Sequence, residues 1–152
     1  MPSVLFVCLG NICRSPLCEA VLKKLVRDKG LDDEFQIDSA GTSAYHIGET
    51  PDDRTVSVCL EHGVPVDHRA RQVTTKDFSM FDYIFCMDDS NLANLKRVMP
   101  RNSKAVLRRY GEFDPQGQTI IEDPYYGGIN GFEINFQQAM RCSEAFLASI
   151  GY

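Results

Sequence analysis

The sequence predicts one α/β domain over residues 1–152, with a four-stranded parallel sheet flanked by helices on both faces. Short apolar segments that read as strands alternate with longer segments in which apolar residues recur every three or four positions. Strands that alternate with helices require right-handed crossovers, and these give a mostly parallel sheet. The length of 152 residues suits one such domain, and the sequence contains no linker or second core.

The four expected strands are marked with different strength. Residues 4–8 (VLFVC) are continuously apolar, as in a strand buried on both faces. Residues 35–39, 83–87 and 104–107 are weaker candidates. Ligands of such sheets bind beyond the carboxyl ends of the strands, so the loop after Cys8 is a candidate site.

Four helices are expected between and after the strands. The first should open at Ser15-Pro16, and the second should run from a capping signal at 50–53 to Gly63. The third should contain Leu92, Leu95 and Met99 and end before Pro100. The fourth should extend over 132–150. Two long, polar stretches rich in glycine and proline remain, at 41–50 and 112–131. Because functional residues concentrate on such loops, both stretches are candidate walls of the site.

Composition narrows the class of protein. A formal net charge of −5 argues against general binding to nucleic acid or to a membrane surface. No secretory signal is visible, and no apolar run approaches the ~20 residues of a membrane-spanning helix. Six cysteines without CxxC or HxxxH spacing favour reduced thiols in a cytoplasmic protein over disulfides or zinc. We therefore expect neither a metal nor a cofactor.

The loop after the first strand combines groups that bind and attack an oxyanion. A nearby arginine and a helix N-terminus can lower the pKa of Cys8 to roughly 3.5–7.5, which yields a nucleophilic thiolate. Arg14 can hold two phosphate oxygens with its planar fork, and Ser15 can donate to the sulfur. Each residue alone has an ordinary structural explanation, but together they predict a phosphate-binding loop. Its members are Cys8, Leu9, Gly10, Asn11, Ile12, Cys13, Arg14 and Ser15.

The stretch 8–16 (CLGNICRSP) resembles the signature of the low-molecular-weight protein tyrosine phosphatases. Related segments follow in that family's order at 37–41, 68–72, 85–91 and 122–127, so the resemblance covers essentially the whole chain. It implies a metal-independent hydrolase of phosphotyrosine and other aryl phosphate monoesters, with acid phosphatase-type activity and a cysteinyl-phosphate intermediate. Its partners would be phosphotyrosine-containing proteins, and inorganic phosphate would be a product.

The resemblance assigns the catalytic roles to Cys8, Arg14 and Asp123. The residues themselves also point to Asp123, because a leaving phenolic oxygen needs a proton donor. Pro124 biases this aspartate toward an extended conformation on its loop, and a nearby phosphate charge would raise its pKa. Asp123 is therefore the expected general acid in the first step and general base in the second.

Further residues are expected to support the site. Tyr125 and Tyr126 suit the wall of a cleft for a phenyl ring, and the family places Tyr45 on the facing side. By the same resemblance, Ser39 and His68 hydrogen-bond toward Asn11 and hold the loop in shape. The resemblance also gives Cys13 a redox role, because the equivalent pair can form a reversible disulfide that protects Cys8 from further oxidation. The other thiols, at positions 18, 59, 86 and 142, read as core.

Two alternative functions remain to be weighed. An arsenate reductase shares this fold and loop but needs two further cysteines on a mobile segment, whereas Cys86 lies within an expected strand with no second thiol nearby. A non-catalytic phosphoprotein-binding module would have lost the nucleophile or the acid, yet Cys8, Arg14 and Asp123 are all present. Both are disfavoured. We expect a monomer or a weak homodimer.

Overall fold

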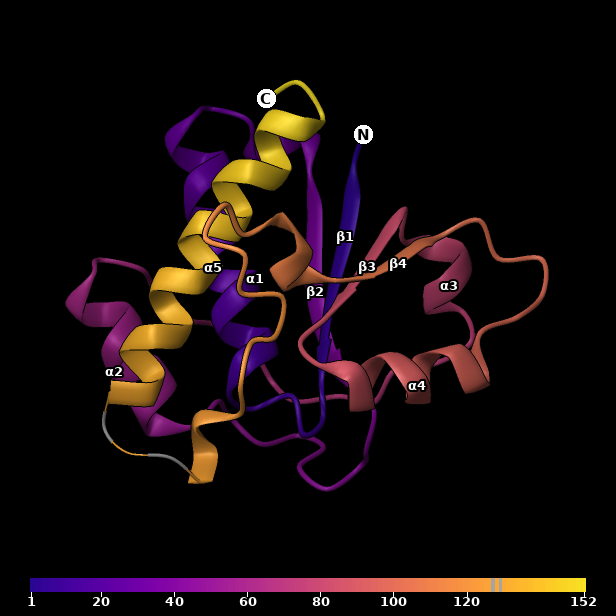
Figure 1. Ribbon diagram of the computed structural model, residues 1–152, viewed down its shortest axis with the longest axis horizontal. Helices are drawn as coiled ribbons and strands as arrows, with labels where there is room; N and C mark the ends of the chain where they lie inside the picture. Colours follow the sequence, from indigo (N-terminus) through magenta and orange to yellow (C-terminus); the bar gives the residue numbers. More distant parts are fainter. Residues whose placement is uncertain (127, 129) are drawn as a thin grey trace.

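The computed structural model describes residues 1–126, 128 and 130–152, except for the side chain of Tyr126. A four-stranded sheet lies between two layers of helices (Figure 1). All neighbouring strands pair in parallel, in the order β2-β1-β3-β4. The strands are β1 (Ser3–Cys8), β2 (Gln36–Gly41), β3 (Tyr83–Cys86) and β4 (Val106–Arg109). The predicted fold class is confirmed.

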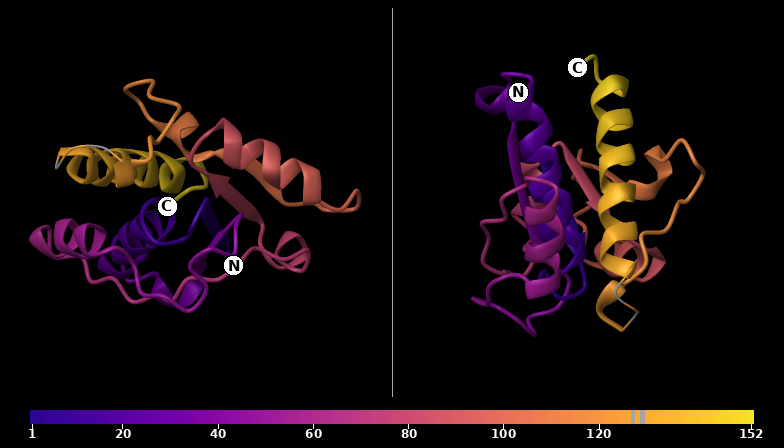
Figure 2. Two further views of the ribbon diagram at one scale, coloured as in Figure 1. Left: turned by 90° about the horizontal axis from the view of Figure 1, so that it is seen from below. Right: turned by 90° about the vertical axis from the view of Figure 1, so that its left-hand side faces the viewer.

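Helices cover both faces of the sheet (Figures 1 and 2). One layer contains α1 (Arg14–Asp28), α2 (Asp53–Glu61) and α5 (Asn130–Ser149). The other contains α3 (Asp77–Met80) and α4 (Asp89–Val98). Short 3-10 turns lie in the connections: η1 (Asp32–Glu34), η2 (Tyr110–Phe113) and η3 (Pro124–Tyr126). Within the described ranges, no helix combines the length and the apolar character needed to cross a membrane.

The alternation of side chains along β1 divides the core into two halves. Val4 and Phe6 pack with the α1, α2 and α5 layer, whereas Leu5 and Val7 pack with the α3 and α4 layer. All four side chains are fully buried. A strand covered on both faces must be apolar at every position, which explains the unbroken run at 4–8.

Several element boundaries differ from the prediction. The last strand begins at Val106 and not at position 104, because the first bond to its neighbour is from the Val106 N–H to the Asp82 carbonyl. The first helix begins at Arg14, so that Pro16 lies within its first turn, where no N–H partner is lost. Helix α3 is absent from the prediction because four residues show no helical periodicity.

Three strands end at one edge of the sheet, and this edge is where the predicted loop lies. Cys8 ends β1 and pairs with Gly41, which ends β2, while Cys86 ends β3. In Figure 1 the loop after β1 and the turn η3 lie at the lower end of the molecule, opposite both termini. The fold therefore brings residues from distant parts of the chain to one end of the sheet.

Candidate active site

The loop of residues 9–13 connects the end of β1 to the start of α1. It lies close against the end of β2, because a Cβ atom at Gly41 would be 2.8 Å from the carbonyl oxygen of Leu9. A side chain at position 41 would push the loop away. Glycine at the end of β2 therefore allows the loop to cross the edge of the sheet.

Asn11 holds this loop in shape. Its Nδ2 donates to Ser15 Oγ at 2.8 Å and to Ser39 Oγ at 3.0 Å. Its Oδ1 accepts from the backbone N–H of Arg71 at 3.0 Å and lies 2.7 Å from His68 Nε2. The structure thus places Ser39 and His68 within hydrogen-bond distance of Asn11. Asn11 connects them to the loop.

The thiol of Cys8 lies at the bottom of the loop, 3% exposed, with its Sγ 3.0 Å from Ser15 Oγ. Because the Ser15 oxygen already accepts a hydrogen bond from Asn11, its own O–H is available to donate to the sulfur. The structure thus gives the Cys8 sulfur a hydroxyl donor within the loop itself.

Arg14 is buried beside the thiol, with a 3% exposed side chain. Its Nη1 donates to Asp88 Oδ2 at 2.6 Å and to the Ile121 carbonyl oxygen at 2.9 Å. Burial works against the positive charge, but the Cys8 sulfur and the Asp88 carboxylate outweigh it and raise the pKa of Arg14. The site therefore keeps a permanent, oriented cation next to the nucleophile.

Asp88 was not identified from the sequence. It caps α4, since its Oδ1 accepts from the Asn91 N–H at 2.8 Å, and its other oxygen orients Arg14. A signal was available, because Asp88 follows β3 at the same edge of the sheet as Cys8. Four further residues around the site were also not identified from the sequence, namely Glu19, His46, Arg54 and Arg71.

Asp123 reaches the site from the other side. Its Oδ2 lies 3.7 Å from Arg14 Nη2, and its Oδ1 accepts from the backbone N–H of Tyr125 at 3.0 Å. The side chain is 32% exposed, so that water can reach the carboxylate. The structure therefore brings Asp123 to the same guanidinium as Cys8, although the two residues are far apart in the sequence.

A narrow cavity of about 160 Å³ opens above the loop. Tyr45 and Tyr125 line it together with Asp123, and both tyrosines are exposed. The guanidinium of Arg54 lies 5.4 Å from the centre of the Tyr125 ring and supports it from outside. The side chain of Tyr126, also expected in this wall, lies outside the described part of the structure. The loop residues that line the cavity are Cys8, Leu9, Gly10, Ile12, Cys13 and Arg14.

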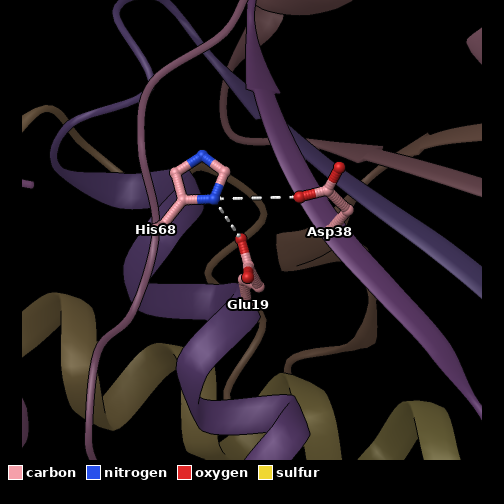
Figure 3. Close-up of side chains that lie close together, drawn as sticks. All are labelled: Glu19, Asp38 and His68. Atoms are coloured by element: carbon pink, nitrogen blue, oxygen red, sulfur yellow. Dashed lines mark ion pairs between the residues drawn. The ribbon is translucent and has the colours of Figure 1, made fainter. Parts of the chain in front are cut away.

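Behind the loop, His68 faces the carboxylates of Glu19 and Asp38 (Figure 3). Its Nδ1 lies 3.2 Å from Glu19 Oε1 and 3.7 Å from Asp38 Oδ1. Its Nε2 faces the Asn11 Oδ1, which also accepts from a backbone N–H and therefore acts as an acceptor. His68 therefore lies between these two carboxylates and Asn11.

The same three side chains have the residue types of a metal site, with donor atoms within 4.8 Å of one another. Their bonding argues against that use. Lys23 already pairs with Glu19 at 2.6 Å, and Arg71 pairs with Asp38 at 3.0 Å. A divalent cation would have to displace these cations and the bond from Ser39 to Glu19. The cluster fits a hydrogen-bonded support for the loop better than a metal ligand set.

The remaining thiols are buried. Cys13 lies in the cavity wall at 5% exposure, and burial together with the negative charges of Asp52 and Cys8 raises its pKa to about 12. Cys18, Cys59, Cys86 and Cys142 are all in the core, and all six cysteines are free. Cys86 is fully buried within β3, with its Sγ 3.6 Å from the Arg108 carbonyl oxygen. This setting differs from that of a relay cysteine on a mobile segment.

A larger cavity of about 560 Å³ lies between α3 and the residues that precede β4. It is lined by aromatic, lysine and hydroxyl side chains and contains no cysteine or histidine among its lining residues. A nucleophile, a guanidinium and a partly exposed carboxylate converge only at the smaller cavity among the described cavities. Because these three groups lie together there, the cavity of about 160 Å³ is the candidate active site.

Comparison with known proteins gives a consistent result. A family model described as "Low molecular weight phosphotyrosine protein phosphatase" matches residues 3–151. The protein of that name from Rattus norvegicus is 54% identical over 147 residues, covering 95% of this chain and 93% of the relative. A solved protein tyrosine phosphatase from Entamoeba histolytica superposes with a TM-score of 0.95 at 38% identity, covering 99% and 97% of the two chains. A Drosophila arginine phosphatase superposes with a TM-score of 0.92 at 36% identity, covering 98% of each.

Proposed function

The chain belongs to the low molecular weight phosphotyrosine protein phosphatase family and is a protein-tyrosine phosphatase. We propose that Cys8, Arg14 and Asp123 carry out its reaction. One observation carries this proposal. A sulfur, a buried guanidinium and a partly exposed carboxylate meet at one cavity of about 160 Å³. These groups are what phosphoryl transfer to a thiolate needs, namely a nucleophile, an oxyanion holder and a proton donor.

In the first step the Cys8 thiolate attacks phosphorus, and the bond from phosphorus to the phenolic oxygen breaks. Arg14 and the N–H groups at the start of α1 hold the phosphoryl oxygens as charge redistributes over them. Asp123, protonated at this stage, gives its proton to the departing oxygen. The products are a phenol and a cysteinyl phosphate at Cys8.

In the second step water attacks the cysteinyl phosphate. Asp123 now takes a proton from that water, and the bond from sulfur to phosphorus breaks. The O–H of Ser15, 3.0 Å from the sulfur, stabilises the departing thiolate. Inorganic phosphate leaves, and both Cys8 and Asp123 return to their starting protonation states.

The walls of the cavity support an aryl substrate. Tyr45 and Tyr125 flank the entrance with aromatic faces, and stacking on a phenyl ring contributes ~0.5–1.5 kcal/mol. A phosphoserine side chain has no ring to use these faces. We therefore propose phosphotyrosine proteins as partners, with little activity on phosphoserine.

The thiols support two further parts of the proposal. Six free cysteines suit a reducing compartment such as the cytoplasm. Under oxidants, Cys13 would form a reversible disulfide with Cys8 and so protect the nucleophile. Both residues line the same cavity.

For the quaternary state we propose a monomer or a weak homodimer. The net charge of −5 disfavours nucleic acid and membrane surfaces as partners.

The test is a substrate panel measured in a metal chelator. Wild-type protein should hydrolyse p-nitrophenyl phosphate and phosphotyrosine peptides, with much slower turnover of phosphoserine and phosphoarginine peptides and no reduction of arsenate. Cys8→Ser should be inactive on all substrates. Activity that survives this substitution, or that disappears in chelator, would contradict the proposed reaction.

A further inference from the structure

The segment that precedes Asp123 is held by side chains from two sides. On one side, the Ile121 carbonyl accepts from Arg14 Nη1 at 2.9 Å, and the Ile121 N–H donates to the Met87 carbonyl at 2.9 Å. These bonds tie the segment to Arg14 and to Met87, the residue that follows β3. They leave the carbonyl groups of the two neighbouring residues facing the opposite way, toward α5.

Two buried amides of α5 take up these carbonyl groups. Asn135 Nδ2 donates to the Glu122 carbonyl at 3.1 Å, and Gln138 Nε2 donates to the Ile120 carbonyl at 3.1 Å. The amides are three residues apart, so they lie on one face of the helix. Three consecutive carbonyls, at 120, 121 and 122, are thus held alternately by α5 and by Arg14.

Hydrogen bonds hold the backbone of this segment on the side of α5, whereas the Ile121 side chain packs into the core. A cavity of about 490 Å³ lies between it and α5, lined by Glu122, Asp123, Asn135 and Gln138 among others. Pro124 lies close to the first turn of α5, where a Cβ atom at Gly131 would be 3.2 Å from the Pro124 Cβ. The amide donors therefore restrain the carbonyls at 120 and 122 in addition to the packing of Ile121.

The oxygens of the same two amides indicate that these side chains are present for their N–H donors. Asn135 and Gln138 are 3% and 4% exposed, and in the described part of the structure neither Oδ1 nor Oε1 has a hydrogen-bond partner. A buried acceptor without a partner destabilises the fold, and an apolar side chain would avoid that. Exchanging the oxygen and nitrogen of Asn135 would set its oxygen against a carbonyl oxygen, so the donor assignment is secure.

We propose that Asn135 and Gln138 are positioning residues for the general acid, holding Asp123 at the phosphate site by fixing the carbonyls of the residues before it. This inference rests on the proposed function, because it requires Asp123 to transfer the proton. A small displacement of a catalytic group is enough to slow a reaction strongly. Loss of the donors should therefore impair leaving-group protonation more than phosphate binding.

The experiment compares leaving groups. For Asn135→Leu combined with Gln138→Leu, kcat/KM on phenyl phosphate, a poor leaving group, should fall at least about fivefold more than kcat/KM on p-nitrophenyl phosphate. Inhibition by inorganic phosphate should change by less than about twofold, since Cys8 and Arg14 are untouched. If the double variant does not fold, Asn135→Asp keeps the side-chain shape and removes the donor.

Gln137→Leu is the matched control, because it removes an exposed amide from the same helix whose partner is Glu133. It should leave the leaving-group dependence unchanged. The inference is overturned if the variants lose activity equally on both substrates, or if Gln137→Leu behaves as they do. Asp123→Asn separates this outcome from failure of the proposed function. If Asp123→Asn leaves the dependence unaltered, the acid role itself is wrong, and if it steepens the dependence while the Asn135 variant does not, only the positioning role is wrong.

Discussion

Asn11 has a backbone conformation that asparagine adopts only at a cost. Its φ is 58°, and it is the only non-glycine with positive φ within the described ranges. The left-handed region costs an L-residue roughly 1–2 kcal/mol. The four hydrogen bonds of its side chain offset this cost, since each contributes about 1 kcal/mol. The loop is therefore held by a side chain and not by backbone preference.

Asn11→Gly separates these two effects. Glycine accepts the positive φ without strain but removes all four bonds, so the free energy of unfolding should fall by about 1–3 kcal/mol. The value of kcat/KM on p-nitrophenyl phosphate should fall at least about tenfold, because Ser15 and His68 lose their connection to the loop. Thermal unfolding and steady-state kinetics measure both. Unchanged kinetics would show that the backbone holds the loop by itself.

Cys13 should be alkylated only very slowly at neutral pH, although it lies at the active site. Burial and nearby negative charge raise its pKa to about 12, so almost none of it is thiolate at pH 7. In Cys8→Ser, alkylation of Cys13 by iodoacetamide should be very slow at pH 7 and should accelerate about tenfold per pH unit up to pH 10. Peptide mass spectrometry measures this. Rapid, pH-independent alkylation would contradict it.

At the scale of elements, the close approach of β2 to the loop is a structural requirement. A Cβ at Gly41 would lie 2.8 Å from a backbone oxygen and 3.2 Å from a backbone carbon of the loop, and neither atom can move as a flexible side chain can.

Gly41→Ala should therefore displace the loop. Overpacking of this kind typically costs about 1–3 kcal/mol of stability. Inhibition by phosphate should weaken clearly, because the loop that holds the anion has shifted. Gly48→Ala, where nothing lies within 4 Å but φ is positive, is the control for strain without a clash. If both variants weaken phosphate inhibition equally, the clash at Gly41 is not the cause.

At the scale of the whole molecule, the buried thiols make the free energy of unfolding decrease as the pH becomes alkaline. Burial raises the pKa of Cys13, Cys59, Cys86 and Cys142 from 9.0 to about 12. Between these values the unfolded chain loses protons that the native state retains. The unfolded state then binds fewer protons, so stability falls as pH rises.

The melting temperature should accordingly decrease from pH 9 upward, with no matching change between pH 7 and pH 8. Calorimetry across this range in a reducing buffer measures it. Cys142→Ala should show a shallower decrease than wild type, because one of the buried thiols with a raised pKa is gone. A melting temperature that stays constant up to pH 11 would contradict the assigned cause.

The whole molecule also shows how much of the site could be predicted. The run at 4–8, the loop after it and the expected strand–helix order were sufficient for the fold class, because burial on both faces forces continuous apolarity. Short elements such as α3 and the start of β4 could not be placed. Their limits depend on single tertiary contacts, such as the bond from Val106 to Asp82, and not on periodicity.

By itself, the sequence determined the parallel α/β class, the position of a phosphate-binding loop and the residue types of its chemistry, because these depend on local order along the chain. Only the tertiary structure decided which distant groups meet that loop. Asp88 orients Arg14, Glu19 and Asp38 face His68, and Asn135 holds the segment that carries Asp123. Such pairings depend on distances across the folded chain, and neither spacing nor composition records those distances.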